Sequence, residues 1–119
     1  MHCDAVINLG SSMVFDFAIH DTPCLFMNYN YLNTENEIQL GVYVYNYVHF
    51  KSKPSVDVVY WLDHPDDIAQ AIIQAITNKE LVVKNAKAWF LKINQEPYQL
   101  ASERIMNTIN QIIQKNNNT

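Results

Sequence analysis

Apolar and polar residues alternate in blocks along the first thirty positions. A short β-branched run, Ala5–Leu9, is followed by a Gly-Ser-Ser turn at 10–12 and then by a mostly apolar stretch of helical length at 13–20. Pro23 prevents that helix from continuing and opens a second apolar run, Cys24–Tyr29. The order of strand, tight turn, helix and strand predicts a βαβ unit with parallel strands and a right-handed crossover.

The middle of the chain has a less regular pattern. Residues 31–40 are mostly polar and predict an exposed loop. From Val42 to Phe50 the side chains alternate between valine and tyrosine or histidine, and this period of two predicts an extended segment. The pattern leaves open whether that segment joins the sheet or lies across it. Val56–Trp61 predicts a third core strand.

Three further helices are predicted after that strand. An Asp-His-Pro-Asp-Asp run at 63–67 combines a capping side chain, an early proline and first-turn acids, and predicts a helix over about 65–77. The helical period returns over Glu80–Ile93 and again, after Pro97, over Tyr98–Gln114. The last helix carries an apolar stripe that needs a surface to lie on: Leu100, Ile105, Ile109, Ile112 and Ile113.

These elements predict an α/β fold, with a partial Rossmann-like parallel sheet of three to four strands flanked by about four helices. A free-standing doubly wound sheet usually has about five strands or more. We therefore expect a fragment of a larger doubly wound domain, or a sheet whose open edge is covered by a second copy. No linker or repeat divides the chain, so residues 1–115 are expected to form one unit and residues 116–119 a frayed tail.

Composition and charge exclude several classes of protein. Of 119 residues, 49% are hydrophobic and 17% charged, which argues against a disordered chain, and no apolar run reaches the length of a membrane span. The net charge of −4 and the single arginine argue against a nucleic-acid surface. No signal peptide is evident, and histidine, cysteine and acidic residues lack metal-ligand spacing. Cys3 and Cys24 are expected to be buried thiols in a reducing cytoplasm.

Candidate chemistry concentrates at Gly10, Ser11, Ser12 and Asp16. A loop that leaves the carboxyl end of a parallel strand and enters a helix presents free amides and the positive end of the helix dipole, which attract phosphate. A glycine there lets a ligand approach the backbone, and the hydroxyls add donors. Ser12, Asp16 and His20 recur every four residues and share one helix face, so Asp16 is placed to accept hydrogen bonds from a ribose.

A structural interpretation of the same residues stays open. Ser11 or Ser12 would be the helix cap, and Asp16 a first-turn acid favoured by the dipole. The functional interpretation is favoured by the position of an acid within an otherwise apolar helix, where nothing else explains a carboxylate.

The segment 4–18, continued by the Asp-Thr-Pro-Cys-Leu-Phe run at 21–26, resembles the donor-binding segment of GT-B glycosyltransferases. It is most similar to bacterial cell-surface polysaccharide enzymes and CDP-glycerol glycerophosphotransferases. Their pattern is a strand, a Ser-Ser pair, an acid four residues on, and a proline that opens the next strand. The resemblance covers about twenty-five residues and implies that the chain is part of a doubly wound GT-B domain.

The resemblance also implies a function. Gly10, Ser11 and Ser12 would bind the diphosphate of a nucleotide-sugar or CDP-glycerol donor, Asp16 would bind its ribose or glycosyl portion, and neither cofactor nor metal is implied. An acceptor domain upstream would complete the cleft, so the chain is expected to be inactive in isolation. A cytoplasmic location is implied, with a position at the inner membrane face left open. The alternative function is a non-catalytic module that self-associates or docks through its sheet edge or last helix.

Overall fold

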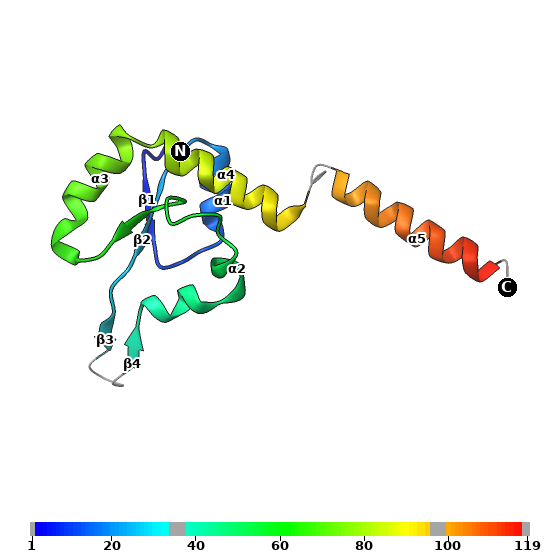
Figure 1. The fold of residues 1–119 in the computed structure, drawn as a ribbon, viewed down its shortest axis with the longest axis horizontal. Coiled ribbons are helices and arrows are strands. Elements are labelled where there is room, and N and C mark those ends of the chain that lie inside the picture. The colour runs from blue at the N-terminus through cyan, green and yellow to red at the C-terminus, as the bar shows by residue number, and fades with distance from the viewer. Residues whose placement is uncertain (1, 34–37, 96–99, 118–119) are drawn as a thin grey trace.

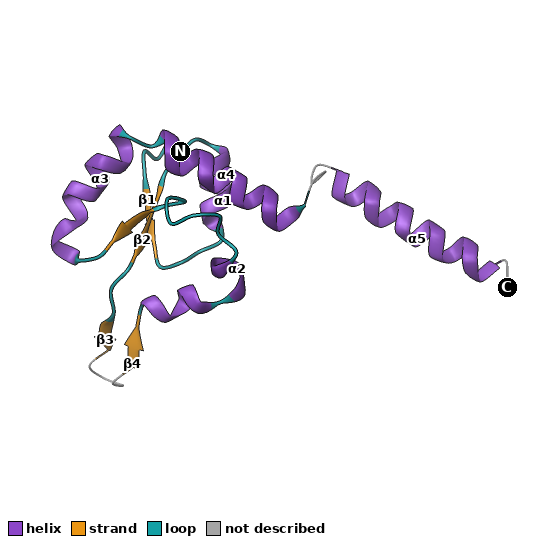
Figure 2. Ribbon diagram, in the orientation of Figure 1, coloured by secondary structure: helices purple, strands orange, loops and turns teal. Residues whose placement is uncertain are grey.

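In the computed structural model the chain forms a parallel three-stranded sheet with helices on both faces (Figures 1 and 2). The structure describes residues 2–33, 38–95 and 100–117. The sheet has the order β1-β2-β5, built from β1 (Val6–Asn8), β2 (Cys24–Met27) and β5 (Tyr60–Leu62). All three strands run parallel, so the predicted βαβ unit is confirmed.

The first crossover follows the sequence pattern closely. Helix α1 (Met13–Ile19) connects β1 to β2, and the turn that ends it places Asp21 at a positive φ of 57°. Val14 and Ala18 are its buried residues, one turn apart on the face that packs against α4 (Glu80–Asn94). The α/β class and the partial parallel sheet are thus present: the parallel sheet has three strands, and the described residues include five α-helices.

The connection from β2 to β5 differs from the prediction in three places. One of them is the expected strand Val56–Trp61, in which residues 56–59 form a turn and the strand begins only at Tyr60. Within residues 31–40, which were expected to form a loop, β3 (Tyr31–Asn33) pairs antiparallel with β4 (Ile38–Leu40). The expected extended segment is instead a 3-10 helix, η1 (Val42–Asn46), followed by the short helix α2 (Val48–Lys51). The valine–tyrosine alternation was misleading because tyrosine is amphipathic and fits either a period of two or a tight helix.

The helices predicted after the third strand are all present. A 3-10 turn, η2 (Pro65–Asp67), leads into α3 (Ile68–Thr77), and His64 caps it by accepting a 3.2 Å hydrogen bond from the Asp66 amide at Nδ1. On α4, Val82 and Trp89 are buried, whereas Leu81 is largely exposed. The buried residues of this helix are Val82, Val83, Ala86 and Trp89.

Helix α5 (Ala101–Asn117) extends away from the sheet in Figure 1 and has no buried residue. It includes Asn116 and Asn117, two of the four residues that were expected to fray. These two are helical because each added residue closes one more backbone hydrogen bond on a helix that has already formed. The other two, 118 and 119, lie outside the described residues.

Two apolar clusters lie on opposite faces of the sheet. Phe26 and Trp89 belong to the cluster under α1 and α4, and Leu25 and Leu62 to the cluster under α3. Side chains alternate across a strand, so successive residues of β2 supply both clusters.

Replacing Phe26 with Ala is expected to lower the free energy of unfolding by about 3–5 kcal/mol, because the fully buried ring leaves a cavity. Urea unfolding followed by circular dichroism measures the change. Ile7→Ala, on the same sheet but 40% exposed, serves as the control and should cost about 1 kcal/mol. Equal losses for the two variants would contradict the assignment of the core.

Candidate functional site

Gly10 lies at the turn between β1 and α1 with a positive φ of 61°. A Cβ atom at this position would lie 2.9 Å from Val44 Cγ2 and 3.0 Å from Tyr45 Cε1. Both side chains come from η1, which folds over the turn. The absence of a side chain at Gly10 therefore allows η1 to pack closely, and the space beside this α-carbon is occupied by protein.

Ser11 takes part in three local hydrogen bonds, one of which is made by its carbonyl, which accepts from the Val14 amide at 3.2 Å. Its amide donates to Asn8 Oδ1 at 3.0 Å, and its hydroxyl accepts from the Met13 amide at 3.2 Å. Ser11 therefore caps the start of α1, as the structural interpretation of the sequence holds. Its amide already has an acceptor, so a diphosphate would have to replace the Asn8 oxygen in order to use it.

Ser12, Asp16 and His20 are exposed and lie along one row of α1, as their spacing requires. The opposite row, Val14 and Ala18, is buried. Solvent therefore accommodates the Asp16 carboxylate, and its place in an apolar helix needs no buried polar partner. Binding of a ligand by Gly10, Ser11, Ser12 and Asp16 stays a prediction.

A buried polar atom lies beside this turn. The Nδ2 atom of Asn8 is inaccessible to solvent and has no hydrogen-bond partner in the described part of the structure. Its Oδ1 atom is fixed toward the Ser11 amide, which determines the orientation of the side-chain amide.

A second group of polar side chains at the carboxyl edge of the sheet was not identified from the sequence. Asn28 and Asp63 directly follow β2 and β5, and Asn28 Nδ2 donates to Asp63 Oδ1 at 2.6 Å. Asn28 also lines a cavity of about 300 Å³ together with Tyr45, Lys53, Val56 and Trp61. The available signal was their position as the first residue after each parallel strand, where such folds bind ligands.

Lys53 supplies the positive charge of this cavity. Its Nζ lies 6.0 Å from the centre of the Trp61 ring and donates to the Phe50 carbonyl at 3.3 Å. Tyr45 separates the cavity from the Gly10 turn, and its hydroxyl donates to the Met27 carbonyl at 2.5 Å. Burial raises the pKa of Tyr45, so its phenol stays protonated and acts as a donor.

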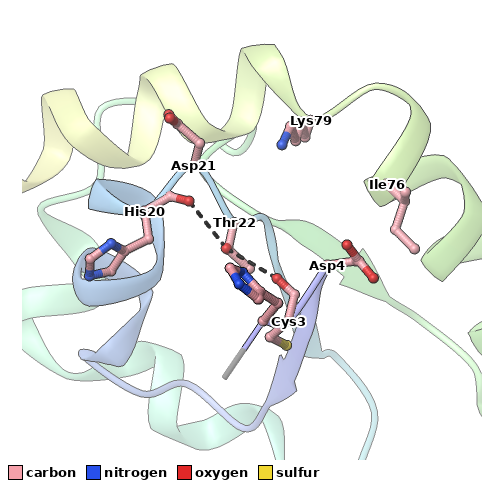
Figure 3. Close-up of a pocket in the computed structure, with 8 residues that line it drawn as sticks. Cys3, Asp4, His20, Asp21, Thr22, Ile76 and Lys79 are labelled. Carbon is pink, nitrogen blue, oxygen red and sulfur yellow. Dashed lines mark hydrogen bonds between the residues drawn. The ribbon is translucent and has the colours of Figure 1, made fainter.

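A larger cavity, of about 450 Å³, lies at the opposite end of the sheet (Figure 3). It is lined by residues that precede β1 and β2 and by the α3–α4 connection, among them Cys3, His20, Thr22 and Lys79. The Thr22 hydroxyl lies 3.4 Å from the carbonyls of Cys3 and His20. These residues gather at the amino ends of the strands, away from the Gly10 turn.

The two cysteines differ in exposure, and both are free thiols. Cys24 is buried as expected, and desolvation raises the pKa of its thiol to about 12. Cys3 is exposed, which corrects the expectation for that residue, because it precedes the first strand rather than lying within it. Among the described residues, no three His, Cys, Asp or Glu side chains form a group that could hold a metal ion.

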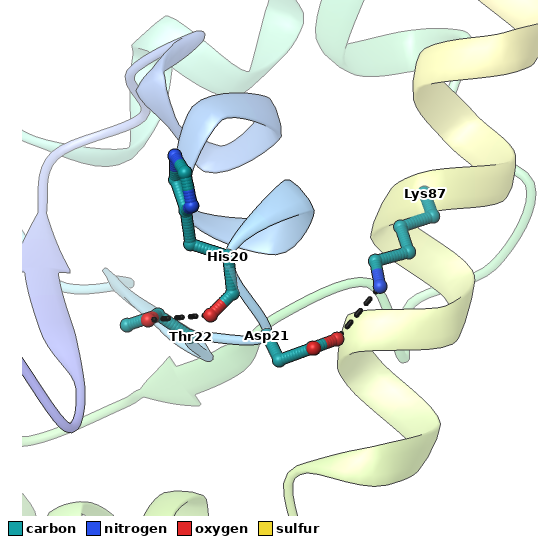
Figure 4. Close-up of polar contacts among 4 residues, drawn as sticks. All are labelled: His20, Asp21, Thr22 and Lys87. Atoms are coloured by element: carbon teal, nitrogen blue, oxygen red, sulfur yellow. Dashed lines mark hydrogen bonds and ion pairs between the residues drawn. The ribbon is translucent and has the colours of Figure 1, made fainter.

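Asp21 and Lys87 tie the end of α1 to α4 (Figure 4). Lys87 Nζ donates to Asp21 Oδ1 at 2.7 Å, and both groups also line a groove of about 600 Å³ along α4. The hydrogen bond from Lys87 and its positive charge lower the pKa of Asp21.

The chain has no match among family models, and comparison with curated proteins and with solved structures also found none. In the described ranges, no helix combines the length and the apolar character needed to cross a membrane.

Gly10→Ala is expected to lower the free energy of unfolding by about 2–4 kcal/mol, through left-handed backbone strain and contact with η1. Thermal and urea unfolding measure this change. Ser12→Ala is the control: Ser12 is exposed and makes no side-chain capping bond, so stability should stay within about 0.5 kcal/mol. A Gly10→Ala protein of normal stability would show that η1 does not pack on this turn.

Replacing Lys87 with Gln should raise the pKa of Asp21 toward the ordinary aspartate value, because the bond and charge that lower it are removed. A carboxyl carbon titration by NMR measures this pKa. A lowered pKa stabilises the fold at neutral pH, and the contribution is lost as the pH falls through the folded-state pKa. The stability difference between the two proteins should therefore vanish in acid, whereas Lys92→Gln should leave the pKa of Asp21 unchanged.

Proposed function

We propose that this chain is the donor-binding part of a GT-B type glycosyltransferase of cell-surface polysaccharide synthesis, and that it binds a nucleotide-sugar or CDP-glycerol. The observation that carries the proposal is the exposed row of Ser12 and Asp16 on α1, at the carboxyl end of parallel strand β1. This is the edge at which open α/β sheets bind their ligands. The sequence resemblance of residues 4–26 supports the same assignment.

In this proposal the diphosphate binds at the start of α1. The exposed Ser12 amide and hydroxyl donate to phosphate oxygens, and the first turn of the helix adds a favourable dipole. Asp16, one turn further along the same row, accepts hydrogen bonds from hydroxyl groups of the ribose or the glycosyl portion. Ser11 contributes by holding the turn in shape through its bonds with Asn8 and Met13.

The row formed by Ser12 and Asp16 is exposed to solvent, which suits one wall of a cleft whose other wall belongs to a second domain. The three cavities described above are not lined by residues 10–16. A donor bound there would have protein on one side only, and GT-B transfer requires a cleft between two domains. We therefore propose that an acceptor domain supplies the opposite wall and that the chain alone does not catalyse transfer.

A second candidate function is non-catalytic association through the last helix. It is favoured by a separate observation: α5 has no buried residue, although five large apolar side chains lie on one of its faces. An exposed apolar face of this kind typically marks a protein interaction site. Light scattering of the full chain, combined with a nucleotide-binding measurement, separates the two functions. A monomer that binds nucleotide favours donor binding, whereas a dimer that does not respond to nucleotide favours association.

Titration of the ¹⁵N-labelled chain with CDP, UDP and their sugars, up to about 10 mM, should shift the amide signals of Gly10, Ser11 and Ser12. Asp16→Asn should weaken binding of the sugar nucleotide several-fold. Binding of the free nucleoside diphosphate should weaken with it where the carboxylate binds the ribose, and stay unchanged where the carboxylate binds the glycosyl portion. Asp67→Asn, at an exposed acid next to α3, is the control and should change neither. Unshifted signals at residues 10–12 across all donors would overturn the proposal.

A further inference from the structure

The apolar face of α5 consists of five large side chains that are each about half exposed. Ile105 is 60% exposed and Ile109, the least exposed of the five, is 42% exposed. At 3.6 residues per turn, the other four all lie within about 60° of Ile109 around the helix. The face is made up of Ile105, Met106, Ile109, Ile112 and Ile113.

A helix of this composition needs an apolar surface to stay folded. Isolated helices shorter than about 12–15 residues are marginal in water even when rich in alanine. The 17 residues of α5 include four isoleucines and four asparagines, which are poorer helix formers than alanine. Since no residue of α5 is buried, contacts with the rest of the described structure add little to its stability, and a partner on its apolar face would stabilise it further.

The spacing of the face is symmetric about Ile109. Its members lie four and three positions before that residue and three and four positions after it. An i±4 row (105, 109, 113) and an i±3 row (106, 109, 112) therefore cross at Ile109, so either type of ridge offers a packing seam there. Reversing the direction of the helix about Ile109 leaves this pattern unchanged, which is the condition for a twofold, isologous contact.

The polar side of α5 argues against a membrane surface as the occupant. Membrane-bound amphipathic helices carry many lysines and arginines on their polar face. Here one acid, Glu103, accompanies two bases, Arg104 and Lys115, and the remaining polar residues are uncharged Ser, Thr, Asn and Gln. A polar side with few charges of mixed sign suits a protein contact, because two copies meet with little like-charge repulsion beside the seam.

We propose that α5 pairs with α5 of a second copy of this chain, antiparallel, with Ile109 on the twofold axis. Met106 then packs against Ile113 of the second copy, and Ile105 packs against the second copy's Ile112. The apolar seam spans about 12 Å, so the interface lies below the standard size, and we expect a dissociation constant in the micromolar range or weaker. This inference deepens the association function proposed above and is independent of donor binding.

Sedimentation velocity of the full chain, from about 5 µM to 1 mM, should show a concentration-dependent dimer. Ile109→Glu places a charge on the axis in both copies and should move dimerisation to at least about tenfold higher concentration. Gln111→Glu adds the same charge on the opposite side of α5 and should leave the equilibrium within about twofold. A chain that stays monomeric throughout, or an unchanged equilibrium in the Ile109→Glu protein, overturns the proposal.

Disulfide trapping tests the antiparallel direction and does not depend on the folding of the charged variant. In a Cys3→Ser background, proteins with Met106→Cys and with Ile113→Cys are mixed in equal amounts and oxidised. Antiparallel pairing should give mainly the mixed disulfide, identified by its mass, whereas parallel pairing gives each variant linked to itself. A random mixture, or predominance of the self-linked products, contradicts the arrangement.

The dimer experiments report only on α5, whereas the amide titration reports only on residues 10–16. Loss of the dimer with normal shifts at Ser12 would therefore remove the pairing and leave the donor-binding proposal intact. A dimer with no nucleotide response would leave the pairing and remove donor binding.

Discussion

The burial of β2 on both of its faces is the constraint on which the rest of the structure depends. Phe26 and Leu25 are adjacent, and both are almost fully buried on opposite sides of the sheet. A strand buried in this way has to be covered by helices on both faces. One cover is α3, and the other is the packed pair α1 and α4. β2 is also the strand in the described sheet that pairs with two neighbours, so both edge strands are held through it.

The aromatic side of this core determines the form of the carboxyl edge. Phe26 stacks on Tyr45 with ring centres 5.7 Å apart, and Tyr45 also meets Phe50 and Trp61 edge to face. These contacts hold η1 and α2 down over the turn at Gly10 and form one wall of the Lys53 cavity. The edge is thus divided in two: a filled region under η1, and an exposed row on α1. A ligand at Ser12 and Asp16 would meet only the exposed row.

The sequence predicts elements well where one period dominates and a strong breaker ends it. Pro23 and the Asp-His-Pro-Asp-Asp run at 63–67 mark boundaries that α1, β2 and α3 respect. The hairpin within residues 31–40 was missed because its strands are three residues long, too short for a period to be recognised. The segment over η1 was missed because Tyr45 is half-buried through long-range contacts with Phe26 and Trp61, which no local pattern records.

The candidate site was likewise predictable only where a local period determines it. The spacing of Ser12 and Asp16 correctly places both on one helix row, since a period of 3.6 suffices for that. The role of Gly10 depends instead on Val44 and Tyr45, which lie more than thirty residues further along the chain. The Lys53 cavity likewise combines residues from three separate segments. Local pattern therefore identified which residues face outward, whereas tertiary packing decided what lies opposite them.

The proposed donor-binding row and the apolar face of α5 lie on separate parts of the molecule. α1 is fixed to the core through Val14 and Ala18, whereas no residue of α5 is buried. Residues far apart and without shared partners contribute to stability nearly additively. A change on α5 should thus leave the sheet and its carboxyl edge unaltered, so association and ligand binding can vary independently. In the two proposals, the α/β body would supply the binding edge and α5 would supply a separate contact.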